Sequence, residues 1–461
     1  MVSKASRREF LKRASALSFA AAGAPFALNL ATIGAASAQV VSGYRAVVCV
    51  FLYGGNDHTN TIIPYDSTDY AEYLNARPEI AIPRNDLTAT SIGPVASQGG
   101  RSFAFHPTLS AFKALYDAGN LAVVPNVGPL VVPTTKSQYE NRSVPLPPKL
   151  FSHNDQQSVW QANTPIGEGA RLGWGGRMGD LLASQNGLPI FTAVSAAGNA
   201  VFLSGQQVLQ YQMSTSGALS IAGISGNLYG SSSASSLYRQ LITGNSTHLF
   251  EDELGQVTSR SIAANSLLAS SLPPASQFVV PVPSGNGLAS QLNIVARMIF
   301  ARSSLSTNRQ VFFVSLGGFD NHDFLLDRHG AQLQQLNDAV NAFYGWLGEM
   351  QLQNNVTLFT ASDFGRTLTS NGDGSDHGWG SHHFVIGGAV QGGEMYGTFP
   401  QVAFGTNEDI RQGNLLPTTS VDQYAATFAR WLGVPDSSVP DILPNIVNFD
   451  AWPSRYLDFL V

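Results

Sequence analysis

Residues 309–322 read RQVFFVSLGGFDNH, and this stretch predicts both a buried strand and the edge at which a site can form. The run from Arg309 to Leu316 is almost continuously apolar, as is typical of a parallel strand covered on both faces. The two glycines after it let the backbone turn sharply and approach a ligand closely. Asp320 and His322 follow that turn, so we expect both at the carboxyl end of the strand.

A helix and a second strand follow, which completes a β-α-β unit. Residues 331–351 carry apolar side chains at spacings of three and four, which indicates one buried helical face. Residues 356–360 have the length and β-branched content of a buried strand. The two strands of such a unit are parallel, so Asp320 and Asp363 should share one sheet edge. Ligands bind at that edge in open α/β sheets.

The same pattern of strand and glycine turn occurs near the start of the chain. The run RAVVCVFLY from Arg45 to Tyr53 ends in Gly-Gly-Asn-Asp-His, which places Asp57 at a strand end. We predict an α/β fold with a mostly parallel sheet sandwiched between helices. Further strands are expected at residues 121–127, 188–194 and 384–386, and further helices at 233–242, 249–268, 288–301 and 422–432.

The loop that follows Asp363 concentrates groups that bind metals. Three of the nine histidines, His377, His382 and His383, fall within seven residues of one another. Imidazole and carboxylate together suit zinc, manganese or iron, whereas calcium prefers oxygen alone. The alternative is a glycine-rich surface loop in which the aspartates serve turns and helix caps.

Two further side chains are candidates for catalysis, each with a structural alternative. Ser152 precedes Asp155 by three residues, which is close to a capping box, so we favour a cap. A serine at a helix start can also act as a nucleophile, because the helix dipole stabilises its alkoxide. His153 either contacts the pocket or lies on the surface. Arg366 either binds the anionic oxygens of a substrate or pairs with a loop carboxylate.

Residues 1–38 are predicted to be an export signal of the twin-arginine type. SRREFLK at residues 6–12 precedes a weakly apolar run and an Ala-x-Ala cleavage site. Glycine, proline and polar residues in that run argue against a stable membrane span. We therefore expect a periplasmic or secreted protein that uses the twin-arginine export machinery. Removing the leader, which carries a net +4, changes the net charge from −6 to −10 and argues against nucleic acid as a partner.

The rest of the chain, residues 39–461, is interpreted as a single α/β domain. Within it, residues 197–274 are rich in serine, glycine and alanine and carry few charges. We interpret this segment as an inserted cap whose helices cover the pocket.

In chain order, the leader and the motifs GGNDHTN, SHNDQQSVWQ, GGFDNHD, SDFGRT and DHGWGSHHFVIGG resemble the exported bacterial family known as domain of unknown function 1501. That family is in turn similar to the alkaline phosphatase and sulfatase superfamily, whose sheet carries metals at its strand ends. The resemblance matches Asp57 to the early aspartate of that superfamily and Asp320 with His322 to the middle pair. It matches Asp363 to the strand that ends in Asp-His, and His377 to the late histidine.

The chain departs from the superfamily at Phe364, where a ligand histidine is expected, and it lacks the Cys-x-Pro-x-Arg sulfatase signature. This departure is consistent with a single metal, with a rearranged pair that uses His58, His382 or His383, or with a site that no longer catalyses.

The resemblance implies an exported metal-dependent hydrolase of phosphate or sulfate esters, acting on an anionic small molecule or polymer. One or two divalent ions, zinc or manganese, would polarise the ester and activate Ser152 or a water, with Arg366 on the substrate anion. Two alternatives stay open: a non-catalytic exported binding protein on the same fold, or an esterase or transferase that modifies envelope polysaccharide. The predicted metal ligands are Asp57, Asp320, His322, Asp363 and His377.

Overall fold

A computed structural model describes residues 43–164, 169–449 and 455–461. The predicted export signal and its cleavage site lie outside these residues. Within the described ranges, no helix is both long enough and apolar enough to cross a membrane.

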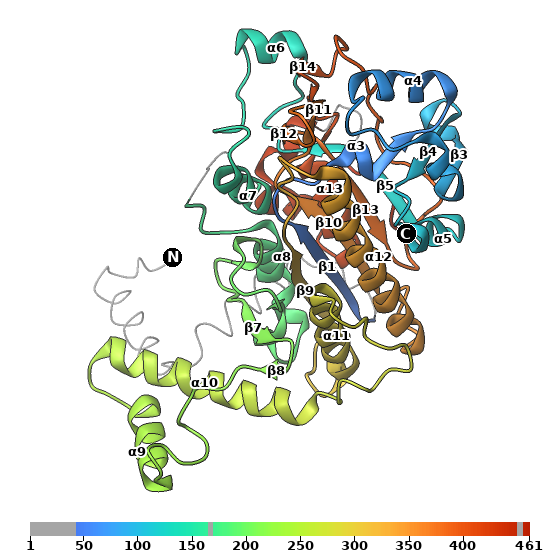
Figure 1. Ribbon diagram of the computed structural model, residues 1–461. Helices are drawn as coiled ribbons and strands as arrows, with labels where there is room; N and C mark the ends of the chain where they lie inside the picture. The colour runs from blue at the N-terminus through green and yellow to red at the C-terminus, as the bar shows by residue number, and fades with distance from the viewer. Residues whose placement is uncertain (1–42, 165–168, 450–454) are drawn as a thin grey trace, which may run out of the picture.

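The centre of the fold is a nine-stranded sheet in the order β16-β5-β13-β10-β1-β9-β6-β7-β8 (Figure 1). Its middle is formed by β1 (Arg45–Leu52), β9 (Arg309–Leu316) and β10 (Val356–Ser362), with β1 parallel to both neighbours. These are the three apolar runs from which the sheet was predicted. Because their carboxyl ends lie side by side, the loops that follow them meet at one edge.

Helices cover both faces of this sheet, and β1 shows why its whole sequence is apolar. Val48 and Val50 point into a core shared with α11 (Gly287–Phe300) and α12 (Leu325–Glu349). Val47 and Phe51 point into a second core shared with α8 (Trp174–Leu182) and α13 (Val421–Leu432). Alternate side chains of a strand face opposite sides, so both sets are buried. The predicted α/β class, with a mostly parallel sheet between helices, is confirmed.

The outer strands differ in part from the expectation. The predicted strand at residues 384–386 is the end of β13 (Ser381–Ile386), which runs antiparallel to β10 and to β5 (Leu121–Gly128). The strand predicted at residues 188–194 is wrong over its first half. Pro189–Phe191 forms a 3-10 turn, because Pro189 has a fixed φ and no N–H for a ladder. Only β6 (Ala193–Ser195) joins the sheet.

Shorter elements complete the described chain. The remaining strands are β2 (Ile62–Pro64), β3 (Ser91–Val95), β4 (Arg101–Phe105), β7 (Tyr211–Ser214), β8 (Gly217–Ala218), β11 (Arg366–Ser370), β12 (Ser375–His377), β14 (Asp409–Arg411), β15 (Asn414–Leu415) and β16 (Thr419–Ser420). The remaining helices are α3 (His58–Thr61), α4 (Ser67–Ala76), α5 (Ser110–Asp117), α6 (Lys136–Asn141), α7 (His153–Ala162), α9 (Ser232–Thr243), α10 (Leu249–Ser271) and α14 (Val439–Ile442).

The segment predicted as a cap contains both helices that were expected in it, α9 and α10. Figure 1 shows them standing out from the body at the lower left, whereas α7, β11 and β12, which carry candidate site residues, lie in the upper half of the view. The expectation that these helices cover the pocket is therefore wrong. Few of their side chains are buried, as expected for helices that stand away from the body of the domain.

Candidate functional site

Two glycine turns bring the ends of β1 and β9 into direct contact. Gly54 and Gly55 have φ values of +115° and +82°, which only glycine adopts without strain. A Cβ on Gly54 would overlap the backbone nitrogen of Asp320. The glycines of the first motif therefore make room for the aspartate of the second.

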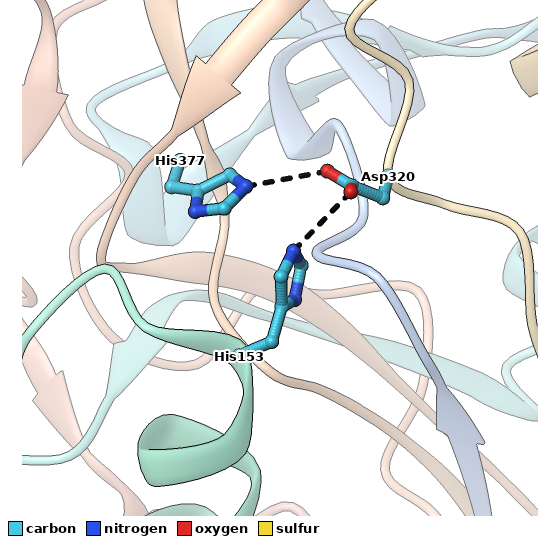
Figure 2. Close-up of side chains that lie close together, drawn as sticks. All are labelled: His153, Asp320 and His377. Carbon is cyan, nitrogen blue, oxygen red and sulfur yellow. Dashed lines mark hydrogen bonds and ion pairs between the residues drawn. The ribbon is translucent and has the colours of Figure 1, made fainter.

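The carboxylate of Asp320 faces three imidazole rings that come from separate segments. His153 begins α7, His322 lies in the loop after β9, and His377 ends β12. The Nε2 atoms of His322 and His377 lie 3.0 Å and 3.3 Å from Oδ1 of Asp320, and Nε2 of His153 lies 3.4 Å from Oδ2. Figure 2 shows the rings of His153 and His377 converging on this carboxylate. We call these four residues the Asp320 cluster.

The opposite nitrogen of each ring, Nδ1, lies within hydrogen-bond distance of an acceptor. A neutral ring that carries its proton on Nδ1 and donates it to that acceptor presents the lone pair of Nε2 to the cluster. Metal-binding histidines show this arrangement, because the second partner fixes the tautomer and the ring orientation. The three partners are Asp363 for His153 (2.7 Å), the carbonyl of Phe151 for His377 (2.7 Å) and Asp376 for His322 (3.2 Å).

The cluster fits a divalent metal ion. Ligand atoms in a tetrahedral zinc site with 2.0–2.1 Å bonds lie roughly 3.3 Å apart. Separations of 3.0–3.4 Å join Asp320 to each of the three histidines, and Nε2 of His322 and His377 are 3.0 Å apart. One ligand atom from each of His153, Asp320 and His377 lies within 4.8 Å of the other two. Nε2 of His153 is buried and has no hydrogen-bond partner among the described residues, as a ligand atom would be before binding. Histidine with one carboxylate suits zinc or manganese better than calcium.

The surroundings of the cluster favour the metal-binding form of Asp320 and His377, and they favour the protonated form of His153. Partial burial opposes the charge on Asp320, but the hydrogen bond and the charge of Arg366 outweigh it and lower the pKa of that carboxyl. Burial lowers the pKa of His377, which favours the neutral ring. The hydrogen bond to Asp363 raises the pKa of His153.

Asp57 lies beside the cluster but is committed elsewhere. It is fully buried, and its oxygens accept a bidentate pair of bonds from Arg77 at 2.9 Å and 2.5 Å. The amide of Asn60 and the hydroxyl of Ser375 donate to the same carboxylate. Burial opposes its charge, but Arg77 outweighs burial and lowers the pKa of Asp57 far below its usual range. A cation at this carboxylate would have to displace a buried arginine.

Asp363 and Phe364, which follow β10, both contact His153. Oδ2 of Asp363 accepts hydrogen bonds from His153 and Gln157, both at 2.7 Å. The predicted ligand therefore contacts the cluster through His153 and fixes the orientation of that ring. The Phe364 ring packs against His153 and His377, with centroids 4.8 Å from each. An aromatic ring thus fills the position where the resemblance predicted a histidine.

The two candidate catalytic side chains have other partners. Arg366 is fully buried and donates to Oδ1 of Asp320 at 2.7 Å, which is the ion pair considered as its alternative. The hydroxyl of Ser152 donates to Asp155 at 2.8 Å, and within the described chain it caps no backbone amide of α7. Arg366 therefore positions Asp320, and Ser152 lies next to His153 with an acceptor for its proton.

The model of the family described as Protein of unknown function (DUF1501) matches residues 44–442. The chain belongs to this family. The resemblance given by the five motifs is thus confirmed. No curated protein matches this DUF1501 chain.

Several solved structures are similar to this DUF1501 chain at low identity. They include the lipoteichoic acid synthase LtaP from Listeria monocytogenes, with 9% identity, coverage of 89% of this chain and 78% of that one, and a TM-score of 0.34. The C-terminal periplasmic domain of EcEptC from Escherichia coli, in complex with Zn, has 11% identity, coverage of 86% of this chain and 84% of that one, and a TM-score of 0.32. An alkaline phosphatase from the Antarctic bacterium TAB5 has 10% identity, coverage of 76% of this chain and 93% of that one, and a TM-score of 0.27.

The sequence left His153 open between a pocket contact and a surface residue, and it assigned neither His153 nor Asp376 a role in binding metal. His153 stands alone at a helix start, and only its place next to Ser152 in the motif signalled a role. His58 and His382, considered for a rearranged metal pair, are buried beside the cluster. The Nδ1 atoms of these two rings accept backbone N–H groups of Arg366 and Asn126 at 3.3 Å and 2.9 Å. His383, also considered, is fully buried in β13.

Proposed function

We propose that this protein is an exported metal-dependent hydrolase of phosphate or sulfate esters. The observation that carries the proposal is the convergence of three histidine Nε2 atoms on one carboxylate, each ring fixed from behind by an acceptor. A structural salt bridge needs no such set of lone pairs. His153, Asp320, His322 and His377 would hold the ion, and a bound zinc or manganese would supply Lewis-acid polarisation of the ester oxygen.

The chain's own residues prepare this chemistry. Arg366 keeps Asp320 ionised and fixed in place through a buried hydrogen bond. Asp363 holds the proton of His153 at Nδ1, so that Nε2 faces the cluster. Ser152 is the candidate nucleophile, because Oδ2 of Asp155 lies 2.8 Å from its hydroxyl and can accept the proton. Because Arg366 is bound to Asp320, we do not expect it to contact an anionic substrate directly. Its contribution is to hold Asp320 in place.

The test combines metal content with ester turnover. Protein purified without a metal-binding tag should contain about one equivalent of zinc or manganese by elemental analysis, as expected for one four-ligand cluster. Asp320→Asn should lose the metal together with hydrolysis of aryl phosphate or aryl sulfate. Asp373→Asn, which changes an exposed aspartate in the turn between β11 and β12, is the control and should keep both. A well-folded wild-type protein without metal would contradict the proposal.

A non-catalytic exported binding protein is the second candidate, and the closed surroundings of Asp57 favour it. Arg77 takes both oxygens of Asp57, and the Phe364 ring packs against His153, so Asp57 offers no free oxygen to the second ion of a two-metal site. In this case the protein would retain one metal equivalent and turn over no phosphate or sulfate ester. Metal content and turnover, measured on one preparation, separate the two candidates.

A further inference from the structure

The helical hairpin of α9 and α10 forms an arm that extends away from the sheet (Figure 1). The C-terminal half of α10 anchors the arm, because Ile262, Ala264 and Leu268 are buried there. The arm beyond this anchor has only Ser235 and Gly255 buried in its two helices. A segment that is this exposed gains little from its own packing, so its apolar side chains need another explanation.

Five large apolar side chains of the arm are exposed to solvent. Each is between 65% and 80% exposed. Within each helix the spacing of four places two of them on one face. Leu241 of α9 and Leu254 of α10 line the same cleft of about 750 Å³, so the two faces adjoin. We call this set the arm patch: Leu237, Leu241, Leu249, Phe250 and Leu254.

The charge of the arm narrows the choice of partner. Residues 231–271 contain two arginines, Arg239 and Arg260, and three adjacent acids at residues 251–253, which gives a net charge of −1. A helix that binds an anionic membrane surface carries lysine and arginine on its polar face, and this arm carries a surplus of acid instead. Two identical arms, by contrast, would meet with almost no net repulsion.

We propose that the arm patch is a dimerisation surface whose occupant is the arm of a second copy of this chain. The five side chains present on the order of 600 Å² of apolar surface, which is as much as a monomer normally leaves in one patch. Two copies related by a two-fold axis would bury about 1,200 Å², the lower bound of specific protein interfaces. The projection of the arm leaves the two sheets clear of each other.

Sedimentation velocity on the purified protein, over a wide range of concentration, tests this proposal. The wild type should dimerise, and Leu241→Glu and Leu254→Glu should each weaken the dimer by about tenfold or more, because each would place a charge in the apolar centre of the interface. Both residues are exposed, so neither change should unfold the monomer. Leu209→Glu, at an equally exposed leucine outside the patch, should leave the dimer intact.

Three outcomes would overturn the proposal. The wild type could stay monomeric at every concentration, or both arm variants could dimerise as well as the wild type. The wild type could also bind vesicles of anionic phospholipid through the arm without forming a dimer, which would make the membrane the occupant. The ester-hydrolase proposal is independent of all three results, because the arm contributes no residue to the Asp320 cluster.

Discussion

Asp57 and Asp320 follow the same pattern of apolar strand and glycine pair, but their surroundings are opposite. The Asp320 side chain is 44% exposed and faces three histidines, whereas Asp57 is fully buried and bound on both oxygens by Arg77. Both lie at the same sheet edge, and both are held as anions by an arginine. The difference lies in the geometry of that arginine, because Arg366 leaves the face of Asp320 toward the histidines open and Arg77 takes both oxygens of Asp57.

The comparison shows that the motif fixes where an aspartate stands, and the neighbours fix what it can do. A carboxylate whose partners are all inside the protein is a structural ion pair, which needs both members because an unpaired buried charge is costly. A carboxylate whose open side faces the lone pairs of histidine rings can serve as a metal ligand. Three predictions separate these roles, beginning with the largest effect.

Arg77→Met should be the most damaging change on the Asp57 side. It leaves Asp57 buried and unpaired, so we expect a loss of about 3–5 kcal/mol in the free energy of unfolding. Urea denaturation of the metal-free protein measures it. The double variant Asp57→Asn/Arg77→Met removes both charges and should recover most of the loss. An Arg77→Met protein as stable as the wild type would show that the pair is not structural.

Asp363→Asn should weaken metal binding about 10- to 100-fold, as expected for the loss of an acceptor behind a ligand histidine. The physical reason is that the Nδ1 proton of His153 loses its carboxylate partner. Competition with a chelator measures the metal affinity. The double variant Asp57→Asn/Arg77→Met serves as the comparison and should bind metal like the wild type. Loss of metal in that double variant would show that Asp57 is a metal ligand, as the sequence predicted.

Acid should destabilise the Asp57 side first. Burial lowers the pKa of His106 to about 3 and that of His329 to about 4. Both values lie below the ordinary pKa of about 6.5, so the unfolded chain binds protons that the folded chain refuses. Stability is therefore complete above that pH and falls toward pH 4. We expect on the order of 1 kcal/mol per histidine between pH 7 and pH 5.5.

Urea midpoints of the metal-free protein at both pH values measure this loss. His329→Gln should make the dependence on pH shallower. A midpoint that stays constant or rises on acidification would show that the two rings are already solvated.

The sequence could predict the features that depend on local residue patterns. The apolar runs of β1, β9 and β10 and their glycine turns fixed the sheet centre and the edge where Asp320 and His377 meet. Arg77 could not be found this way, because nothing around it marks a residue that reaches back to Asp57. The direction of β13 was equally hidden, since three apolar residues fit either orientation. The arm helices were visible in the sequence, but their distance from the site depends on packing alone.

The strands that pair with β1 come late in the sequence, and this affects how the chain folds during synthesis. Its neighbours on both sides, β9 and β10, begin at Arg309 and Val356, so β1 has no strand to pair with until the ribosome has finished most of the protein. At 5–20 residues per second the wait lasts roughly 15–60 s. During that time an eight-residue strand of almost entirely apolar character is available to other chains. Nascent β1 is therefore the segment on which we expect chaperones to act first.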